Sequence, residues 1–261
     1  MVRRKPRPDD TMNLLITATA RFSADRPPEA ESDLKALLRM PDGKTLLSRA
    51  LDAAAGFADC GRKVVVGPKE VAAAVAEREG LTYLEEGVGD FDSLLRGLLA
   101  CAESPRLTVC TAHLPHLDAG ALANLVANAP ADAAINLPVY AREEFKRHYP
   151  TVRTAFLKLA DGEVTGASAA VVHGPTMLRA EPIIRRLFEA RTNPVGLAGM
   201  LGFGIAAKFM SGRLTSEDVR AKAESMLKCR CTLLRSCSPK LALSVTTPLS
   251  WEDIRALPTG E

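Results

Sequence analysis

The sequence has no apolar run long enough to cross a membrane. Its longest apolar segment, LAGMLGFGIAA at residues 197–207, ends at the charged Lys208. A membrane-spanning helix needs about 20 consecutive apolar residues. We therefore expect no membrane span and predict a buried or half-buried helix for this segment. A helix lying in the membrane interface is the alternative that this pattern leaves open.

The chain also lacks an excess of one charge. Its 34 Lys and Arg residues oppose 31 Asp and Glu residues, which leaves a net charge of +3. This balance argues against a nucleic-acid partner, because proteins that bind nucleic acid usually present a basic patch to its phosphates. Much of the basic excess lies in the opening segment MVRRKPRP, which no apolar run follows, so it is not a secretory signal. We predict a disordered basic arm over residues 1–11, with a phosphate-binding arm as the alternative.

The cysteines lack the spacing of a zinc site. The chain has 6 of them, and the only cluster is Cys229, Cys231 and Cys237. Zinc sites usually pair cysteines at CxxC spacing or combine them with a nearby histidine, and neither pattern occurs here. We therefore interpret these residues as structural thiols of a reducing compartment and predict a cytoplasmic location.

What the chain does contain is a regular alternation of strand-like and helix-like segments. Short β-branched and apolar runs are separated by stretches whose apolar residues recur at helical spacing. The predicted strands are residues 13–20, 63–66, 81–84, 107–112 and 133–139, and the predicted helices are residues 46–56, 69–79, 91–103 and 119–128.

This alternation determines the expected fold class. Strands separated by helices imply right-handed crossovers and a mostly parallel sheet. We predict an α/β fold, a three-layer αβα sandwich with a mainly parallel, Rossmann-like sheet. Because no linker rich in Gly, Ser or Pro and no internal repeat interrupts the chain, we predict a single domain over residues 12–261.

The second half of the chain is less regular. A hairpin is predicted at Asp161-Gly162, between a strand at 154–159 and a strand-containing segment at 163–172. Helices are expected at 176–191 and 195–210. Capping boxes are expected at Thr215 with Asp218 and at Ser250 with Asp253. A last strand is predicted at residues 240–247.

Chemistry in such a sheet is expected where the strands end. Ligands of open parallel sheets bind beyond the carboxyl ends of the strands. This rule places residues 17–22, 67–69 and 112–116 near one another. The third of these segments, in TVCTAHLPHL, contains two histidines, His113 and His116.

Several segments, in this order, resemble one family. They are TATARF, then DLKALL and PDGKTLL, then KVVVG, FDSLLRGL and TVCTAHLPHL, followed by LKLADGEVTGASAAVV and LALSVTTPLSWEDI. This order resembles the nucleotidyltransferases of the molybdenum-cofactor guanylyltransferase and sugar-nucleotide synthase type, over roughly residues 13 to 257. The resemblance implies a nucleotide or phosphorylated small molecule as partner, a Gly-rich phosphate loop, a phosphate-facing lysine, and carboxylates that hold Mg²⁺.

Carried over by position, the resemblance assigns roles to particular residues. Ser93 matches a position that helps to hold the base, and a helix N-terminal cap is an equally good interpretation of it. Lys35 and Arg21 are also assigned a catalytic role. The residues assigned to nucleotide binding are Thr17, Ala18, Thr19, Arg21, Lys35, Gly67, Ser93 and His113.

The sequence departs from the family pattern at the metal positions. His113, Ser244 and Thr246 stand where the resemblance implies carboxylates, so no metal ligand is assigned. The loop after the first strand also has no glycine, and each non-glycine residue forced to positive φ would cost about 1–2 kcal/mol. For His113 the open interpretations are a polar loop residue, a phosphate-binding residue and a transition-metal ligand.

Three functional hypotheses follow. The first is a nucleotidyltransferase-like protein that binds a nucleotide or phosphorylated small molecule, with transfer weak or lost and no cofactor. The second is an active Mg²⁺-dependent nucleotidyltransferase that uses other acids, such as Asp90, Asp92 or Asp118. The third is a non-catalytic scaffold of the same fold. The sequence predicts no oligomeric state.

Overall fold

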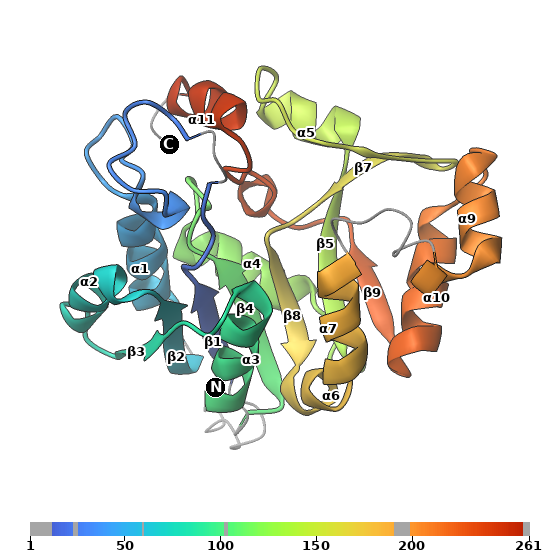
Figure 1. Cartoon of the computed structure of the whole chain (residues 1–261), viewed down its shortest axis with the longest axis horizontal. Helices are drawn as coiled ribbons and strands as arrows, with labels where there is room; N and C mark the ends of the chain where they lie inside the picture. Colours follow the sequence, from blue (N-terminus) through green and yellow to red (C-terminus); the bar gives the residue numbers. More distant parts are fainter. Residues whose placement is uncertain (1–11, 23–25, 59, 102–103, 191–198, 258–261) are drawn as a thin grey trace, which may run out of the picture.

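A mixed sheet flanked by helices forms the centre of the molecule (Figure 1). The computed structural model describes residues 12–22, 26–58, 60–101, 104–190 and 199–257, so the predicted basic arm lies outside the described residues. Within these residues the sheet has nine strands: β1 (Met12–Thr17), β2 (Cys60–Gly67), β3 (Leu81–Glu85), β4 (Arg106–Thr111), β5 (Ile135–Ala141), β6 (Leu157–Leu159), β7 (Gly162–Gly166), β8 (Ala169–His173) and β9 (Cys231–Leu234).

The strand order explains how the sheet is mixed. It runs β3-β2-β1-β4-β8-β5-β7-β6, with β9 beside β5. Strands β1 to β4 pair in parallel, whereas β8 is antiparallel to both β4 and β5. The α/β prediction with a mostly parallel core is therefore confirmed. The strands predicted at residues 63–66, 13–20 and 107–112 are the adjacent strands β2, β1 and β4, whereas β8 separates β4 from β5, the strand predicted at 133–139.

The central strand β1 packs on both faces. Its residues Leu14 and Ile16 belong to one hydrophobic cluster, and Leu15 belongs to the other. Side chains alternate between the faces of a strand, so an apolar run of this kind is typical of a parallel strand covered on both sides. This burial places the end of β1, where a site was predicted, on a rigid support.

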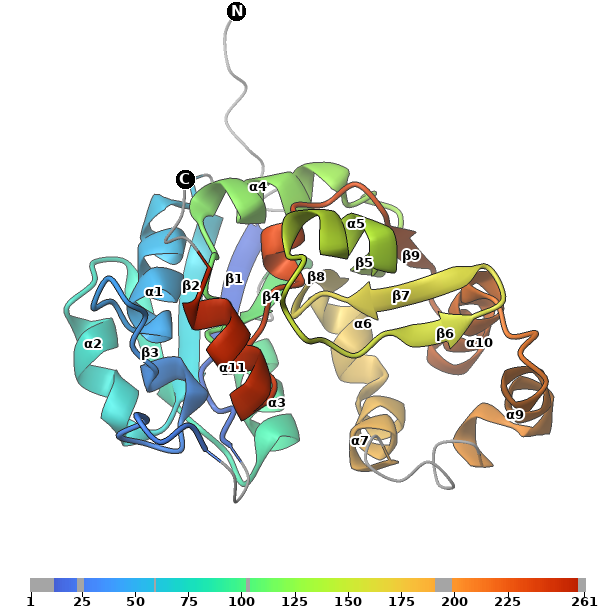
Figure 2. The same ribbon diagram turned by 90° about the horizontal axis from the view of Figure 1, so that it is seen from above.

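Helices cover the two faces of the sheet. Those described are α1 (Leu46–Gly56), α2 (Ala72–Ala76), α3 (Asp90–Ala100), α4 (Ala119–Asn128), α5 (Arg142–His148), α6 (Gly174–Arg179), α7 (Glu181–Ala190), α9 (Phe203–Met210), α10 (Ser216–Leu227) and α11 (Pro248–Arg255). Figure 2 shows α1 and α4 on one face and α3 and α6 on the other. This arrangement is the predicted three-layer sandwich.

Several helix boundaries were predicted correctly from their local capping residues. Helices α1 and α4 have the predicted bounds, and the Asp118 carboxylate accepts a hydrogen bond from the backbone N–H of Ala121 at the start of α4. The capping box of Thr215 and Asp218 is present at the start of α10. For α11 the prediction was wrong by one turn, because Thr247 is the cap and Ser250 is its partner within the first turn.

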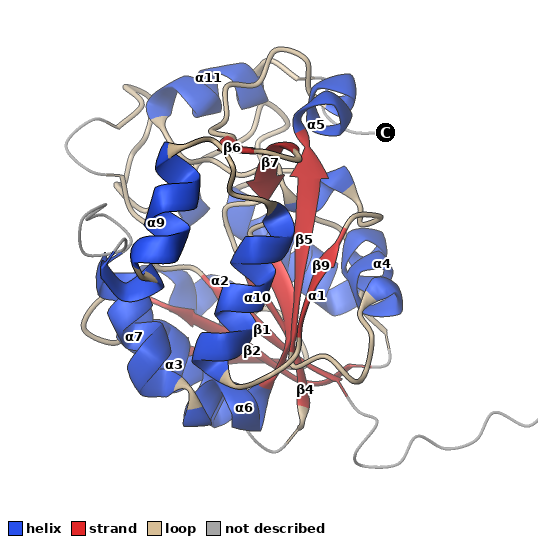
Figure 3. Cartoon of the chain, turned by 90° about the vertical axis from the view of Figure 1, so that its right-hand side faces the viewer, coloured by secondary structure: helices blue, strands red, loops and turns tan. Residues whose placement is uncertain are grey.

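Long-range packing decides the outcome of two further predictions in the second half. Residues 240–247 form a 3-10 turn and an extended segment rather than a strand, although Leu241, Leu243 and Val245 are buried. The described part of residues 197–207 is half-buried at residues 200–202, 205 and 206 and exposed elsewhere, because α9 stands on the outer flank beside α10 with Phe203 88% exposed (Figure 3). No helix in the described part of the chain could span a membrane.

Candidate functional site

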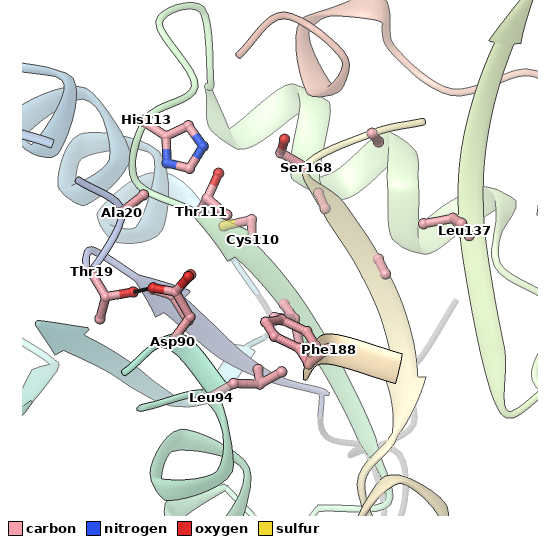
Figure 4. Close-up of a pocket in the computed structure, with 15 residues that line it drawn as sticks. Thr19, Ala20, Asp90, Leu94, Cys110, Thr111, His113, Leu137, Ser168 and Phe188 are labelled. Carbon is pink, nitrogen blue, oxygen red and sulfur yellow. Dashed lines mark hydrogen bonds between the residues drawn. The ribbon is translucent and has the colours of Figure 1, made fainter. Parts of the chain in front are cut away.

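A cavity of about 360 Å³ opens where β1 and β4 end (Figure 4). The two strands are parallel neighbours, and Thr17 at the end of β1 pairs in register with Thr111 at the end of β4. This is the edge at which ligands of parallel sheets bind. The cavity is lined by Thr17, Thr19, Ala20, Asp90, Leu94, Val109, Cys110, Thr111, His113, Leu137, Ala167, Ser168, Ala169, Ala170 and Phe188.

Hydroxyl groups gather at one end of the cavity. The Thr19 hydroxyl donates a hydrogen bond to the Asp90 carboxylate over 3.4 Å, which joins the loop after β1 to the start of α3. The Thr111 hydroxyl oxygen is buried and finds no hydrogen-bond partner in the described part of the chain. A buried polar atom without a partner costs about 1–3 kcal/mol, so a ligand that bonds to it would recover this energy.

The loop after β1 does not need glycine, because none of its described residues has positive φ. Across the described ranges, Lys228 is the only non-glycine residue with positive φ, so Ala18, Thr19 and Ala20 carry no left-handed strain. The cost anticipated from the sequence therefore does not arise. Ala18 is buried, and its backbone N–H donates to the Val66 carbonyl over 2.7 Å.

Lys35 lies close to this polar end. Its ammonium donates to the Thr246 backbone carbonyl over 2.8 Å and lies 5.0 Å from the centre of the Phe22 ring. Burial lowers the pKa of Lys35, and the Asp90 carboxylate acts in the opposite direction. Neither contact neutralises the ammonium, because a carbonyl and a ring have no net charge. This cation is therefore available to an anionic ligand.

His113 is half-buried at the same end of the cavity. Burial lowers the pKa of His113 to about 4, with the Lys35 ammonium acting in the same direction, so the imidazole is neutral at pH 7. The carbonyl of His113 accepts a hydrogen bond from the Val245 N–H over 3.2 Å, which fixes the loop after β4 against residues 240–247. At neutral pH the ring offers a hydrogen bond but no charge.

Arg21 does not line the cavity, contrary to the prediction that it shares one pocket with Thr17, Lys35 and His113. Its guanidinium binds the Glu86 carboxylate over 2.6 Å and lies 3.8 Å from Asp33. The hydrogen bond to Glu86 raises the pKa of Arg21. An arginine bound in this way by carboxylates has little charge left for a phosphate. Thr17 and His113 do line the cavity, and Lys35 lies beside it without lining it.

Gly67 and Ser93 lie beside the cavity rather than in its wall. A Cβ on Gly67 would come within 3.2 Å of the Ala18 Cβ, so this glycine allows the end of β2 to approach the loop. The Ser93 hydroxyl donates to the Gly89 carbonyl over 2.8 Å and accepts from the Gly87 N–H over 3.0 Å. Ser93 is buried in the first turn of α3 and is not its cap, so its role in this structure is to hold the preceding loop.

Residues 30–194 match the model of one protein family, described as the MobA-like NTP transferase domain. The chain belongs to this family. The match covers more than half of the sequence and includes every strand that borders the cavity except β1. No curated protein matched the sequence significantly.

Solved structures of several transferases share the fold of this family member. A structure described as a hypothetical transferase from Thermus thermophilus is 24% identical with a TM-score of 0.78, over 94% of this chain and 99% of that chain. A 2-C-methyl-D-erythritol 4-phosphate cytidylyltransferase, also from Thermus thermophilus, is 18% identical with a TM-score of 0.54, over 94% and 98%. A CMP:2-keto-3-deoxy-manno-octonic acid synthetase, solved with CTP, is 15% identical with a TM-score of 0.53, over 94% and 97%.

The positions at which the family resemblance places metal ligands do not fit Mg²⁺ in this NTP transferase domain. His113 is neutral, and Ser244 and Thr246 line a neighbouring hollow of about 600 Å³ that adjoins the cavity at Ser168. Mg²⁺ prefers carboxylates and phosphate oxygens. Within the residues that the structure describes, no group of three or more His, Cys, Asp or Glu side chains could hold a metal.

The three acids named as substitutes are placed differently from one another. Asp92 binds Arg185 over 2.9 Å, and Asp118 caps α4 and binds Lys240 over 2.6 Å. Although burial alone would raise it, the pKa of Asp118 is lowered by the hydrogen bond from Lys240. Asp90 is the one carboxylate among the described residues that line the cavity.

Thr111, Ser168 and Phe188 are among the lining residues that were not predicted from the sequence. Thr111 directly precedes the segment 112–116, so extending that segment by one residue would have included it. Ser168 precedes β8, whose position beside β4 could not be read from the pattern. Phe188 belongs to α7, and no local signal connects that helix with the carboxyl ends of β1 and β4.

Proposed function

We propose that the cavity binds a nucleotide or another phosphorylated small molecule and that nucleotidyl transfer is weak or lost. One observation carries the proposal: the polar end of the cavity combines a neutral His113 and threonine hydroxyls with a single carboxylate, Asp90, and the Lys35 ammonium lies beside this end. The cation and the hydroxyls suit phosphate oxygens, which accept hydrogen bonds and attract a cation, and the carboxylate suits ribose hydroxyls, which donate hydrogen bonds.

Lys35 is the phosphate-facing residue in this proposal. Its hydrogen bond to a carbonyl and its contact with an aromatic ring involve groups without net charge, and the Asp90 carboxylate interacts with it at longer range. A partly exposed cation contributes on the order of 1 kcal/mol to the binding of an anion. Thr17, Thr19 and Thr111 would orient the bound group through their hydroxyls.

Weak transfer follows from the missing carboxylates. In phosphoryl and nucleotidyl transfer a divalent cation stabilises the charge that develops on phosphate oxygens, a contribution of several kcal/mol. A loss of this size lowers the rate by about 10³-fold or more. Turnover of GTP, CTP or ATP with a phosphorylated acceptor should therefore stay near background.

Asp90 supports a second candidate function, Mg²⁺-dependent nucleotidyl transfer. Mg²⁺ is often held by one or two carboxylates together with substrate phosphates, so one acid in the cavity meets the smallest requirement. This alternative makes Asp90 indispensable for binding, whereas the proposal above does not.

Calorimetric titration with ribonucleoside triphosphates, with and without Mg²⁺, tests both functions. We expect binding that does not require Mg²⁺ and that weakens about fivefold in Lys35→Met, as one lost charge contact predicts. Lys44→Met is the matched control, because the Lys44 ammonium is exposed and binds Asp52 over 3.0 Å. Binding only with Mg²⁺, and its loss in Asp90→Asn, would support the second function. Absence of binding would favour a scaffold.

A further inference from the structure

The last helix, α11, is joined to the loop that carries Lys35. Figure 1 shows α11 beside the segment that follows β1, although the two are far apart in the sequence. The Glu29 carboxylate of this loop accepts a hydrogen bond from the Trp251 indole N–H over 2.8 Å and another from the Arg255 guanidinium over 2.6 Å. Both bonds meet at the same carboxylate oxygen, so Glu29 alone makes this link.

A second link joins α11 to the Lys35 side chain itself. The Lys35 ammonium donates to the Thr246 carbonyl over 2.8 Å. The backbone N–H of Thr246 donates in turn to the hydroxyl of Ser250, in the first turn of α11, over 3.0 Å. The stretch from Glu29 to Lys35 is therefore fastened to α11 at both of its ends.

Apolar packing fixes this stretch only in part. Ala30 and Leu34 are buried, but a hollow of about 190 Å³ lies between the loop and the Trp251 ring. Trp251 itself is 1% exposed, so its indole N–H has to find a partner inside the protein. Glu29 supplies that partner from across the hollow, and its hydrogen bonds connect what the apolar contacts leave apart.

A lysine held in one position binds an anion better than a freely rotating one. A free lysine side chain samples many rotamers, and fixing it before binding removes that entropic cost from the binding step. An ammonium has three N–H donors, and the Thr246 carbonyl accepts one of them, which leaves donors for a ligand. The link between α11 and the loop therefore bears on how well Lys35 can bind an anion.

We propose that Glu29 is a positioning residue, which holds Lys35 in place for an anionic ligand by tying its loop to α11. The inference rests on the proposed function, in which Lys35 is the phosphate-facing residue. Without the Glu29 carboxylate, Trp251 and Arg255 lose their partner, and only the Lys35 side chain joins the stretch to α11 by a hydrogen bond. Because Glu29 acts through Lys35, its removal weakens binding less than removal of the Lys35 ammonium does.

A double-mutant cycle tests whether Glu29 acts through Lys35. The probes are CTP and inorganic tripolyphosphate, each titrated calorimetrically into the unchanged protein and its variants. We expect Glu29→Ala to weaken both probes about threefold, which is less than the effect of about fivefold expected for Lys35→Met. In the Lys35→Met background, Glu29→Ala should change neither affinity further, because two changes that remove one interaction are not additive.

Two control variants separate the hydrogen bonds of Glu29 from its charge. Glu29→Gln keeps an oxygen that accepts from the Trp251 indole, so it should bind both probes nearly as tightly as the unchanged protein. Glu31→Ala removes a carboxylate from the same stretch, at an exposed residue that makes no hydrogen bond or ion pair within the described ranges. It should not weaken binding, because loss of a negative charge does not reduce the attraction for an anion.

The link itself can be observed without a ligand. Trp251 is the only tryptophan of the chain, so its indole N–H gives a single NMR signal. Hydrogen exchange at this N–H should be slow in the unchanged protein and in Lys35→Met, and faster in Glu29→Ala. Because Glu29 and Arg255 are 41% and 49% exposed, Glu29→Ala should still fold, and Arg255→Met provides a second variant that weakens the same link.

Four outcomes would overturn the inference. If Lys35→Met weakens binding and Glu29→Ala does not, the inference fails and the proposed function stands. Equal weakening by Glu29→Ala with and without the Lys35 ammonium would show that Glu29 only supports the fold. Unchanged indole exchange in Glu29→Ala would show that the link does not depend on this carboxylate. If the unchanged protein binds neither probe, the inference and the proposed function fail together.

Discussion

The two halves of the sheet differ in how completely their helices are buried. In the half built on β1 to β4, helices α1 and α4 bury leucines and alanines along one face. In the half built on β5 to β9, α7 and α9 have no fully buried residue. The first half is therefore stabilised by its own packing, while the second keeps apolar surface that a ligand or partner would cover.

The largest expected contrast concerns one leucine from each half. Leu122 of α4 is fully buried, so Leu122→Ala should lower the free energy of unfolding by about 2–5 kcal/mol. Leu187 of α7 is half-buried, and Leu187→Ala should cost less than about 1 kcal/mol. Urea denaturation of both variants measures the difference. Equal costs would show that α7 is packed as tightly as α4.

A second contrast uses two glycines inside helices. A Cβ on Gly97 of α3 would lie 2.3 Å from Leu15 Cδ1, and Leu15 is completely buried, so Gly97→Ala should cost about 1–3 kcal/mol. A Cβ on Gly204 of α9 would meet nothing within 4 Å, so Gly204→Ala should stabilise by up to about 1 kcal/mol. Melting temperatures should shift in opposite directions, and a shared direction would contradict the comparison.

A smaller effect concerns pH and the polar end of the cavity. The pKa of His113 is about 4 in the folded protein and about 6.5 in an unfolded chain, so the unfolded state binds a proton first as the pH falls. The free energy of unfolding should therefore decrease between about pH 6.5 and pH 4. Between pH 7 and pH 5 this contribution is about 1–2 kcal/mol.

His113→Asn should remove that part of the pH dependence. The measurement compares urea denaturation of the variant and the unchanged protein at pH 7 and at pH 5. A smaller loss of stability in the variant is expected, because its side chain has no proton to bind. The same loss in both proteins would show that His113 is accessible enough to be protonated in the folded state.

The smallest effect is expected at Arg21, an exposed residue of the well-packed half. Exposed ion pairs such as Arg21 with Glu86 contribute about 0–1 kcal/mol, so Arg21→Met should barely change the free energy of unfolding. Nucleotide affinity should stay within about twofold, because Glu86 already occupies the guanidinium. A tenfold loss of affinity, measured calorimetrically, would restore the role that the family resemblance assigned to Arg21.

The same difference between halves separates what could be predicted from what could not. Helices α1 and α4 were predicted with their correct bounds because a cap and an apolar face within the segment define them. Strand β9 was missed, and residues 240–247 were assigned a strand that is absent. Whether an apolar run joins a ladder depends on a distant neighbour, here β5 for β9.

The amino-acid sequence by itself determined which groups stand at the strand ends: a loop without glycine, Lys35, and His113 in place of a carboxylate. These are local facts, and the family's α/β fold follows from equally local periodicity. Only the tertiary structure decided which charges are compensated and which side chains close the cavity. Arg21 meets Glu86 across 65 residues, and Phe188 reaches the cavity from α7. Such pairings depend on how distant segments pack, and no local pattern encodes them.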